Sequence, residues 1–379
     1  MRIMHRTNRI PTAHHGRLSR PMKIADETST TGSGCGASGG RRHRRGFLSW
    51  IAVAAILAAS VATAAAEPLK IRVAWVVVPN NLPPILFAKP GLARHQDQSY
   101  AMDAIHFSGT PQMISAFGAN EIAIALLAYS SLAVAIENAG MTDLRVIADA
   151  FQDGAPGYYT DEYMVLKDSP IRTVEDLRGK ILGSNVTGGA IDVGLRAMLL
   201  QHNLDARKDV TIVEVAFPNM RAALSEGKVE LIGTGLPFAQ DPALRAAART
   251  IFTQREAIGR SEMIVWVARA GFLAANRAAL VDFMEDVLRA LHFFTDPANH
   301  REAVDIVARF NKQPAENYDA WLFKPGGDYY RDANAVPDLD ALQSNIRTQV
   351  KFGFLKADLD IAQYADLSLI KQAAARLSP

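Results

Sequence analysis

Short strand-like runs alternate with helix-like segments along most of this 379-residue chain, and this alternation constrains the fold more than any other feature. Residues 69–78 (LKIRVAWVVV) are mostly apolar and rich in valine, which is typical of a strand buried on both faces. Thr110 followed by Pro111 predicts a helix start, because proline suits the first helical position. The same order continues to about residue 249. The sequence therefore predicts an α/β fold built from strand–helix–strand units.

Two interruptions of this rhythm predict where the chain passes between lobes. Gly, Pro and Tyr residues break the pattern at residues 153–160, and residues 250–253 are interpreted as a second crossing. After a predicted strand at residues 262–269, the chain is nearly all helical. We therefore expect a first lobe formed by residues 67–152 plus 254–379, and a second lobe formed by residues 153–253. A helix is also expected at residues 83–95, within the first lobe.

The first 66 residues are interpreted as an export signal rather than as part of the fold. Arginines 44 and 45 open the run RRGFL, an apolar run extends from Trp50 to about Ala62, and small residues continue to Ala66. The paired arginines favour a twin-arginine signal, with an ordinary secretory signal as the alternative. Met22 is an alternative start. Cleavage near Ala66 would leave a periplasmic protein.

Composition excludes several classes of function for the expected mature protein. Residues 67–379 carry 31 Lys and Arg against 37 Asp and Glu, a formal charge of −6 that argues against nucleic-acid binding. Cys35, the only cysteine, lies in the export signal, so disulfides and thiolate chemistry are not expected. The histidines show no metal-ligand spacing, and no nucleophile elbow or phosphate-binding loop is present. We expect no catalytic residue, metal or cofactor.

The loop at residues 184–189 (SNVTGG) is the best candidate for a ligand site. It lies between a predicted strand and a predicted helix, and ligands of open α/β sheets bind beyond the carboxyl ends of strands. The helix start offers free N–H groups and a partial positive charge, which suit a carboxylate or sulfonate. The alternative is a glycine turn before a capped helix, and the sequence alone leaves the two about even.

Other candidates share a position after a strand or at a helix start. The full set of candidate ligand-binding residues is Asn80, Asn81, Gly109, Thr110, Tyr129, Ser130, Asn185, Thr187, Gly188, Gly189, Pro237 and Phe238. A Ser or Thr at a helix start ordinarily acts as a cap, although a cap can also face a ligand. Aromatic residues that could line the same cleft are Trp75, Tyr158, Tyr159 and Phe238. Arg221 and Arg260 could pair with an anion, although exposed arginines are usually only solvated.

The run at residues 169–180 (SPIRTVEDLRGK) resembles a signature of solute-binding proteins of bacterial ABC importers. The resemblance is to their nitrate/sulfonate/taurine group, which includes relatives of thiamine-precursor binders. Residues 108–111 (SGTP), 209–210 (DV) and 223–230 (ALSEGKVE) agree with this group in their order, and the likeness covers residues 69–310. It implies a two-lobe periplasmic-binding-protein-like (type II) fold. Each lobe would be a sheet flanked by helices, with a ligand cleft between the lobes.

The resemblance also implies a function. We expect a periplasmic substrate-binding component that captures a small organic anion by lobe closure and delivers it to a membrane ABC permease. The family pattern is not kept at residues 118–123 (GANEIA) or 233–238 (GTGLPF), and both departures concern the ligand. One alternative is an enzyme on the same two-lobe scaffold, either precursor-synthesising or group-transferring. Another is a ligand-sensing partner of a membrane receptor.

Overall fold

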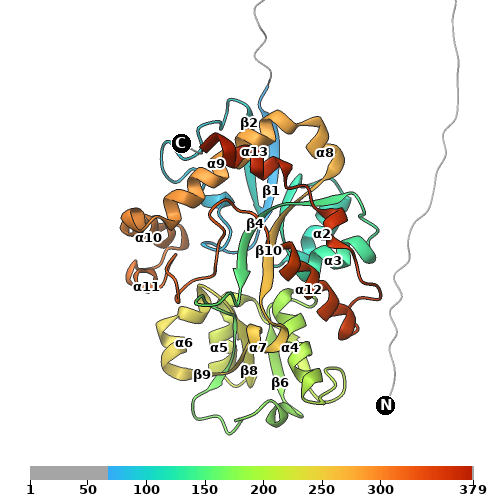
Figure 1. The fold of residues 1–379 in the computed structure, drawn as a ribbon. Helices are drawn as coiled ribbons and strands as arrows, with labels where there is room; N and C mark the ends of the chain where they lie inside the picture. The colour runs from blue at the N-terminus through green and yellow to red at the C-terminus, as the bar shows by residue number, and fades with distance from the viewer. Residues whose placement is uncertain (1–66, 378–379) are drawn as a thin grey trace, which may run out of the picture. The chain divides into compact units, whose positions relative to one another are not determined.

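Two five-stranded sheets organise residues 67–377, the part of the chain that the computed structural model describes (Figure 1). The predicted export signal lies outside these residues. The first sheet contains β1 (Leu69–Trp75), β2 (Tyr100–His106), β3 (Ile124–Ala128), β4 (Leu144–Asp153) and β10 (Ser261–Arg269). Their order is β2-β1-β3-β10-β4, and β10 runs antiparallel to both of its neighbours.

The second sheet repeats this arrangement with different strands. It contains β5 (Glu162–Leu166), β6 (Ile181–Ser184), β7 (Thr211–Glu214), β8 (Leu231–Thr234) and β9 (Ala248–Thr253). Their order is β7-β6-β8-β5-β9, and β5 runs antiparallel to both β8 and β9. Each sheet therefore has one reversed strand in the fourth position. The predicted α/β fold class is confirmed.

The burial of individual strands follows their place in the sheet. All five residues of the inner strand β3 are buried, because helices and the neighbouring strands leave neither face open to solvent. The edge strand β7 has exposed residues at both ends and half-buried residues between them. An apolar strand such as β3 can therefore only be an inner strand.

Helices flank both sheets. Those before β10 are α2 (Thr110–Gly118), α3 (Tyr129–Glu137), α4 (Ala190–Gln201), α5 (Met220–Ser225), α6 (Pro242–Ala247) and α7 (Gln254–Ile258). Those after it are α8 (Ala270–Ala275), α9 (Arg277–Thr295), α10 (His300–Asn311), α11 (Glu316–Asp319), α12 (Leu339–Lys351) and α13 (Ser368–Leu377). Short 3₁₀ turns are η1 (Pro83–Ile85), η2 (Glu175–Leu177), η3 (Phe217–Asn219), η4 (Phe238–Gln240), η5 (Pro297–Asn299) and η6 (Ile361–Tyr364). Helix α13 packs on α9, and α12 packs on β10 and α3.

The expected crossing at residues 250–253 is wrong, because these residues belong to β9. Its β-branched and aromatic residues favour a strand, and this strand pairs with β5 from Glu162 to Leu166. The chain instead passes from the second sheet to β10 through α7. Thr253 and Glu256 form a capping box that fixes the start of α7 directly after the strand. The segment between β4 and β5 and the segment between β9 and β10 both connect the two sheets. They are joined by a hydrogen bond in which Gln254 N donates to Asp161 O at 2.8 Å.

The helix expected at residues 83–95 is also wrong. Only Pro83–Ile85 is helical, as the 3₁₀ turn η1, and irregular turns follow. Pro90 lacks the amide proton a helix needs, and Gly91 has a φ of 87°, outside the helical region. The apolar residues of the segment, such as Leu86 and Leu92, are buried all the same. The spacing of apolar residues in this segment therefore predicted their burial correctly but not a helix.

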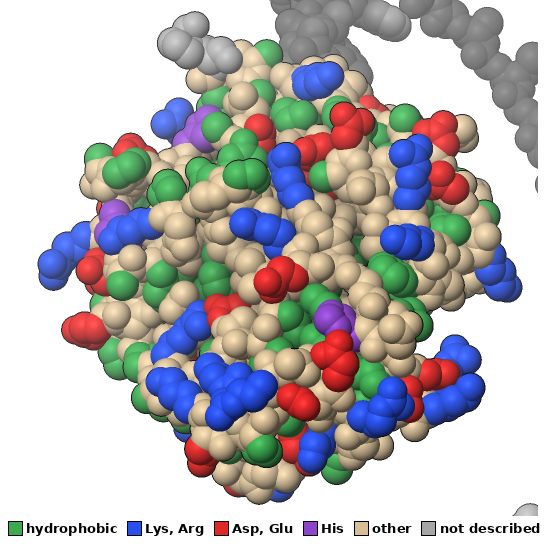
Figure 2. Space-filling model, turned by 60° about the horizontal axis from the view of Figure 1, so that its bottom comes forward, with side chains coloured by type: hydrophobic (Ala, Val, Ile, Leu, Met, Phe, Trp, Pro, Cys, Tyr) green, Lys and Arg blue, Asp and Glu red, His purple; other side chains and the backbone are tan. Residues whose placement is uncertain are grey.

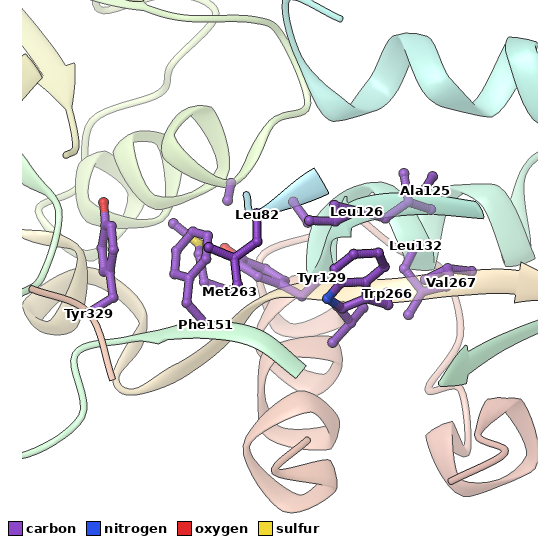
Figure 3. Packing of buried hydrophobic residues seen from close by; sticks show 14 of the residues in the cluster. Leu82, Ala125, Leu126, Tyr129, Leu132, Phe151, Met263, Trp266, Val267 and Tyr329 are labelled. Atoms are coloured by element: carbon purple, nitrogen blue, oxygen red, sulfur yellow. The ribbon is translucent and has the colours of Figure 1, made fainter. Parts of the chain in front are cut away.

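The largest group of buried apolar residues extends through both sheets. It includes Ile71 of β1, Trp266 of β10, Tyr163 of β5 and Leu182 of β6. Figure 3 shows part of it, with Trp266 beside Tyr129 and Leu132. A smaller cluster, which includes Met164, covers the other face of the second sheet. The two halves of the protein therefore share much of one core.

The surface carries charges of both signs. Lys and Arg side chains are interspersed with Asp and Glu over the face in Figure 2, where several basic side chains gather at the lower left. Within residues 67–377, none of the helices has the length and apolar character required to cross a bilayer.

Candidate functional site

Six of the predicted ligand-binding residues line one cavity between the two sheets, called here the central cavity. They are Asn80, Asn81, Gly109, Thr110, Asn185 and Gly189. The cavity offers about 80 Å³ to the centres of water-sized molecules, enough for several waters. Phe151, Met263 and Tyr329 form part of its apolar wall, and Figure 3 shows Phe151 next to Met263 with Tyr329 farther along. The central cavity is thus bordered by both sheets and by the chain after α11.

The loop after β1 is held by its own side chains. Asn81 Oδ1 accepts hydrogen bonds from Val76 N at 2.8 Å and from Val77 N at 3.2 Å. Asn80 Nδ2 donates to Leu236 O at 2.8 Å, which links the first sheet's loop to the loop after β8. Asn80 Oδ1 is buried and has no hydrogen-bond partner. The loop therefore presents one free acceptor inside the protein and one contact between the two halves.

Two helices begin at the central cavity, one from each half of the molecule. Helix α2 follows Gly109 and α4 follows Gly189, and neither helix start has a side-chain cap. No hydrogen bond is recorded for the amides of Thr110, Ala190 or Ile191 within the described residues. Thr110 Oγ1 lies 2.7 Å from Ser131 Oγ, so the hydroxyl is used within the first half. Free amides and the positive ends of two helix dipoles therefore border one cavity.

Asn185 adds an unpaired group to the same cavity. It follows β6, the strand that precedes α4, and its Oδ1 atom is buried with no hydrogen-bond partner. Asn80 and Asn185 thus each leave an amide oxygen unpaired, one on each side of the cavity. Buried polar atoms are normally paired, so a free one at a cavity wall indicates a place for a polar solute.

Two of the polar residues that line the central cavity, Asp161 and Tyr329, were not identified from the sequence. Asp161, in the passage to β5, is 2% exposed, and its Oδ1 accepts a hydrogen bond from Tyr329 OH. The Tyr329 hydroxyl also accepts from Leu236 N at 3.1 Å. Asp153 Oδ2 accepts from Asp161 N at 2.7 Å. The only sequence signal for Asp161 was its position at the end of the predicted crossing, and Tyr329 gave none.

Pro237 and Phe238 line a second, larger cavity of about 560 Å³, called here the aromatic cavity. It shares Val76 and Val77 with the central cavity and also contacts both halves. Its aromatic walls are Trp75 and Phe310 on one side and Phe238 on the other. The rings of Trp75 and Phe310 lie 5.9 Å apart, and Phe238 stacks on Phe217 at 5.5 Å.

The two arginine candidates are already paired. Arg221 lines the aromatic cavity, where its Nε lies 2.7 Å from Asp241 Oδ2. Arg260 Nη2 lies 2.9 Å from Asp338 Oδ2, and its Nε donates to Gln152 Oε1 at 3.1 Å. Neither lines the central cavity.

Ser130, Thr187 and Gly188 line a third cavity, on which α3, α4 and α12 border. Ser130 Oγ donates to Gly188 O at 3.1 Å, so these two residues contact each other across the halves. Thr187 N donates to Glu214 Oε1 at 2.8 Å. Tyr129 is 1% exposed and lines none of these three cavities, and its hydroxyl lies 3.5 Å from Gln254 Nε2. The predicted ligand-binding residues are therefore divided among three cavities, and Tyr129 lines none of them.

A family model described as the NMT1-like family matches residues 64–308. The chain belongs to the NMT1-like family. This agrees with the predicted resemblance to solute-binding proteins, which the structural neighbours also support. A search of the curated proteins finds no match.

Solved structures similar to this NMT1-like protein have the same two-lobe architecture. The alkanesulfonate-binding protein SsuA from Xanthomonas axonopodis pv. citri, bound to MOPS, superposes with a TM-score of 0.63 at 18% identity, over 80% of this chain and 99% of that chain. The periplasmic nitrate-binding protein NrtA from Synechocystis PCC 6803 superposes with a TM-score of 0.65 at 15% identity, over 82% and 90%. The desulfurization enzyme DSZB superposes with a TM-score of 0.56 at 13% identity, over 82% and 100%. At these identities the likeness shows the fold, and the predicted two-lobe fold is confirmed.

Three possible metal ligands meet elsewhere in this NMT1-like protein. One ligand atom each from His95, Asp282 and Glu285 lies within 4.8 Å of the others. Arg376 Nη1 donates to Asp282 Oδ1 at 2.6 Å, and Arg289 Nη2 donates to Glu285 Oε1 at 2.6 Å. Two guanidinium groups therefore already neutralise these carboxylates, and we assign no metal there.

Four buried carboxyl groups near the central cavity of this NMT1-like protein have raised pKa values. Burial raises the pKa of Asp149 and of Asp153 to about 7, and raises the pKa of Asp161 and Glu262 well above the usual range. Asp149 Oδ1 and Glu262 Oε1 are buried without a hydrogen-bond donor. The neighbouring carboxyl group of Asp149 raises the pKa of Glu262 further, in addition to burial. One proton shared between these two carboxyl groups satisfies both oxygens.

We expect the stability of this protein to fall as the pH rises from about 4 to 7. Carboxyl groups in an unfolded chain titrate near 4. The folded state, with raised pKa values, binds more protons than the unfolded state over this interval. Stability is therefore greatest below about pH 4, as far as these groups contribute, and this contribution is lost as the pH passes the folded pKa of about 7. Urea unfolding at pH 5 and pH 8 measures the difference.

Asp149→Asn tests whether the Asp149–Glu262 pair causes this pH dependence of stability. An Asn side chain can donate to Glu262 without a shared proton, so at pH 8 we expect the variant to be more stable than the wild type by about 1 kcal/mol or more. Asp305→Asn, at an exposed position of α10, is the control and should leave the pH dependence unchanged. A wild-type protein that is equally stable at pH 5 and pH 8 would contradict the prediction.

Proposed function

We propose that this chain is the periplasmic solute-binding component of an ABC importer, which captures a small organic anion between two lobes. The observation that carries this proposal is the pair of uncapped helix starts at one cavity. Helix α2 comes from the first half and α4 from the second, and both begin beside the central cavity after a glycine. Helix N-termini attract anions through free amides and the helix dipole. An anion that contacts both would also hold the two halves together.

The lobes that we propose are those expected from the sequence, residues 67–152 plus 254–379 and residues 153–253. All strands of the second sheet lie within residues 162–253, and all strands of the first sheet lie outside them. Closure would bend the passages around Asp161 and Gln254, which hydrogen-bond to each other. Hinge closure about such short passages is a well-known motion of two-lobe proteins.

Export belongs to the same proposal. The twin-arginine signal and cleavage near Ala66 lie outside the described residues. The export proposal is supported by similar solved structures, which include a periplasmic aliphatic sulphonate-binding protein and a periplasmic nitrate-binding protein. The sequence of the mature N-terminus, expected to begin at Glu67, tests the cleavage site. Replacing both Arg44 and Arg45 by Lys should block export by the twin-arginine route and leave an ordinary secretory route working.

The anion is tested by titration calorimetry of the protein beginning at Glu67 with nitrate, alkanesulfonates and small carboxylates. We expect at least one of these solutes to bind with 1:1 stoichiometry. Recovery of the solute unchanged after prolonged incubation separates a binding protein from the alternative, an enzyme on this scaffold. That alternative has a parallel in DSZB, an enzyme with the same fold. If none of the anions binds, the proposal is wrong.

Asn185→Asp should weaken anion binding by about tenfold or more. The replacement has nearly the same shape and adds a negative charge at the wall of the central cavity. Two like charges about 4–6 Å apart repel each other by a few kcal/mol in the interior of a protein. Asn219→Asp is the matched control, because Asn219 is exposed, belongs to the same half and lines none of the three cavities. Equal losses in both variants would exclude a local effect.

A further inference from the structure

The peptide group of Leu236, in the loop after β8, is held by two side chains from the other proposed lobe. Leu236 N donates to Tyr329 OH at 3.1 Å, and Leu236 O accepts from Asn80 Nδ2 at 2.8 Å. All three residues are buried and line the central cavity. Leu236 belongs to the proposed second lobe, whereas Asn80 and Tyr329 belong to the proposed first lobe. These two hydrogen bonds therefore join the lobes at the cavity wall.

Tyr329 is fixed to the first sheet independently of Leu236. The carbonyl oxygen of the next residue, Tyr330, accepts from Gln152 N at 2.8 Å, and Gln152 belongs to β4. The ring of Tyr329 lies 4.4 Å from the ring of Phe151, which also belongs to β4. Both contacts lie within the proposed first lobe, so we expect them to persist when the lobes separate. The contact between Tyr329 and Leu236 would then be lost.

The hydrogen bond from Tyr329 to Asp161 determines what the hydroxyl can do. A hydroxyl group carries one proton, and Tyr329 OH donates it to Asp161 Oδ1. The lone pairs of the same oxygen are left to accept, and Leu236 N is the donor. Burial raises the pKa of Asp161 well above its usual range, and a protonated carboxyl group still keeps an oxygen that accepts. The hydroxyl is therefore oriented to accept from the backbone of the loop after β8.

Gly235 lets the loop after β8 come this close to Tyr329. A Cβ atom on Gly235 would lie 2.6 Å from Tyr329 OH and would also meet Asp161 Oδ1. Gly235 is not among the described glycines with a positive φ, so its backbone conformation does not itself require glycine. The close approach to Tyr329 requires it instead. The residues on both sides of this contact are therefore suited to it.

We propose that Tyr329 is a latch residue, whose hydroxyl holds Leu236 in the closed state and so sets how slowly a captured solute is released. This inference rests on the proposed function, because it assumes that the lobes open and close around a solute. In the open state water can satisfy Leu236 N, so the hydrogen bond stabilises the closed state alone. Without the hydroxyl, Leu236 N would be buried and unpaired in the closed state, which shifts such an equilibrium by about tenfold or more.

Tyr329→Phe tests the latch, because it keeps the ring and removes only the hydroxyl. Rapid-mixing kinetics measure the association and dissociation of nitrate, propanesulfonate and butyrate, and the tightest-binding of these anions is the probe. We expect dissociation to become about tenfold faster or more, because the closed state is weakened. Association should change by less than about twofold, because the solute meets the open protein. A general loss of structure would lower the binding-competent fraction and would not split the two rates in this way.

Tyr330→Phe is the matched control. Tyr330 is the next residue, no hydrogen bond is recorded for its hydroxyl within residues 67–377, and it lines none of the three cavities. This variant should keep both wild-type rates.

A pair of spin labels measures closure itself. The protein beginning at Glu67 contains no cysteine, so two introduced cysteines are the only thiols that a label can reach. Asn219→Cys and Glu316→Cys place one exposed label on each proposed lobe, each beside a residue that lines the aromatic cavity. We expect longer label-to-label distances, and hence a smaller closed fraction, in Tyr329→Phe than in the wild type. The comparison is made on the free protein and at each concentration of the probe.

The results separate the latch from the proposed function. If an anion binds but Tyr329→Phe releases it no faster than the wild type, the latch is wrong and the proposed function stands. Equally fast release from Tyr330→Phe also overturns the latch, because that residue does not contact Leu236. If no anion binds, the proposed function fails, and equal closed fractions in Tyr329→Phe and the wild type then overturn the latch as well.

Discussion

Trp266→Ala is expected to lower the free energy of unfolding by about 3–5 kcal/mol. Trp266 is 2% exposed at the centre of β10, where it pairs with Leu126 and Ala148 of the two neighbouring strands. Its ring lies 5.9 Å from that of Phe283, so α9 packs against it. The Ala variant loses the transfer free energy of the indole ring and leaves a cavity that this core cannot close fully. Equilibrium unfolding in urea, monitored by circular dichroism, measures the loss.

The control is an aromatic residue at the surface. Phe87 is 42% exposed, and Phe87→Ala should change the free energy of unfolding by less than about 1 kcal/mol. Similar small losses for both variants would mean that β10 does not hold the core together. In that case the packing of α9 against the first sheet would need another explanation.

Gly109→Ala is expected to weaken ligand binding by about 10- to 100-fold while the protein stays folded. A Cβ atom on Gly109 would lie 2.6 Å from Val186 Cγ1, which belongs to the opposite half. The φ angle of Gly109 is −173°, which any residue adopts, so the backbone of the first half accepts the change. The added methyl group would hold the halves apart at the central cavity, and a solute would lose contact with one of the two helix starts.

A second substitution separates this effect from a local defect. Val186→Ala removes the atom that the new methyl group meets, so the double variant should recover most of the lost affinity. Gly271→Ala is the matched control, because a Cβ atom there has no neighbour within 4 Å. If Gly109→Ala binds as tightly as the wild type, the two halves need not approach each other as closely as here. If the double variant binds no better than Gly109→Ala, Val186 is not the obstacle.

Local sequence patterns predicted most of the secondary structure. Strand β3 was recognisable from its unbroken apolar run, and α2 from Thr110 and Pro111 at its start. These features act within a few residues of each other, so a single sequence displays them. The predictions failed at residues 83–95 and 250–253. In the first segment proline and glycine outweighed apolar spacing, and in the second the pairing of β9 with β5 decided the conformation.

The sequence predicted only part of the candidate site. The rule that ligands bind beyond the carboxyl ends of strands led to Asn80, Thr110 and Asn185, and all three line the central cavity. The same rule also selected Ser130 and Thr187, which line a different cavity. A strand end marks the correct edge of a sheet, but it does not tell which side of that edge faces the other half.

The sequence by itself determined the α/β class, the start of α4 after Gly189, and the negative charge of residues 67–379, because each depends on neighbouring residues or on composition. It predicted Thr110 as the N-cap of α2, which is wrong, because the N-cap is Gly109 and Thr110 is the first residue of the helix. Only the tertiary structure decided that both helix starts border one cavity and that Asp161 lies in its wall. The pairing of Asp161 with Tyr329 joins residues 168 positions apart. Such a contact is set by how two sheets and a returning chain pack together, and no local pattern of residues records it.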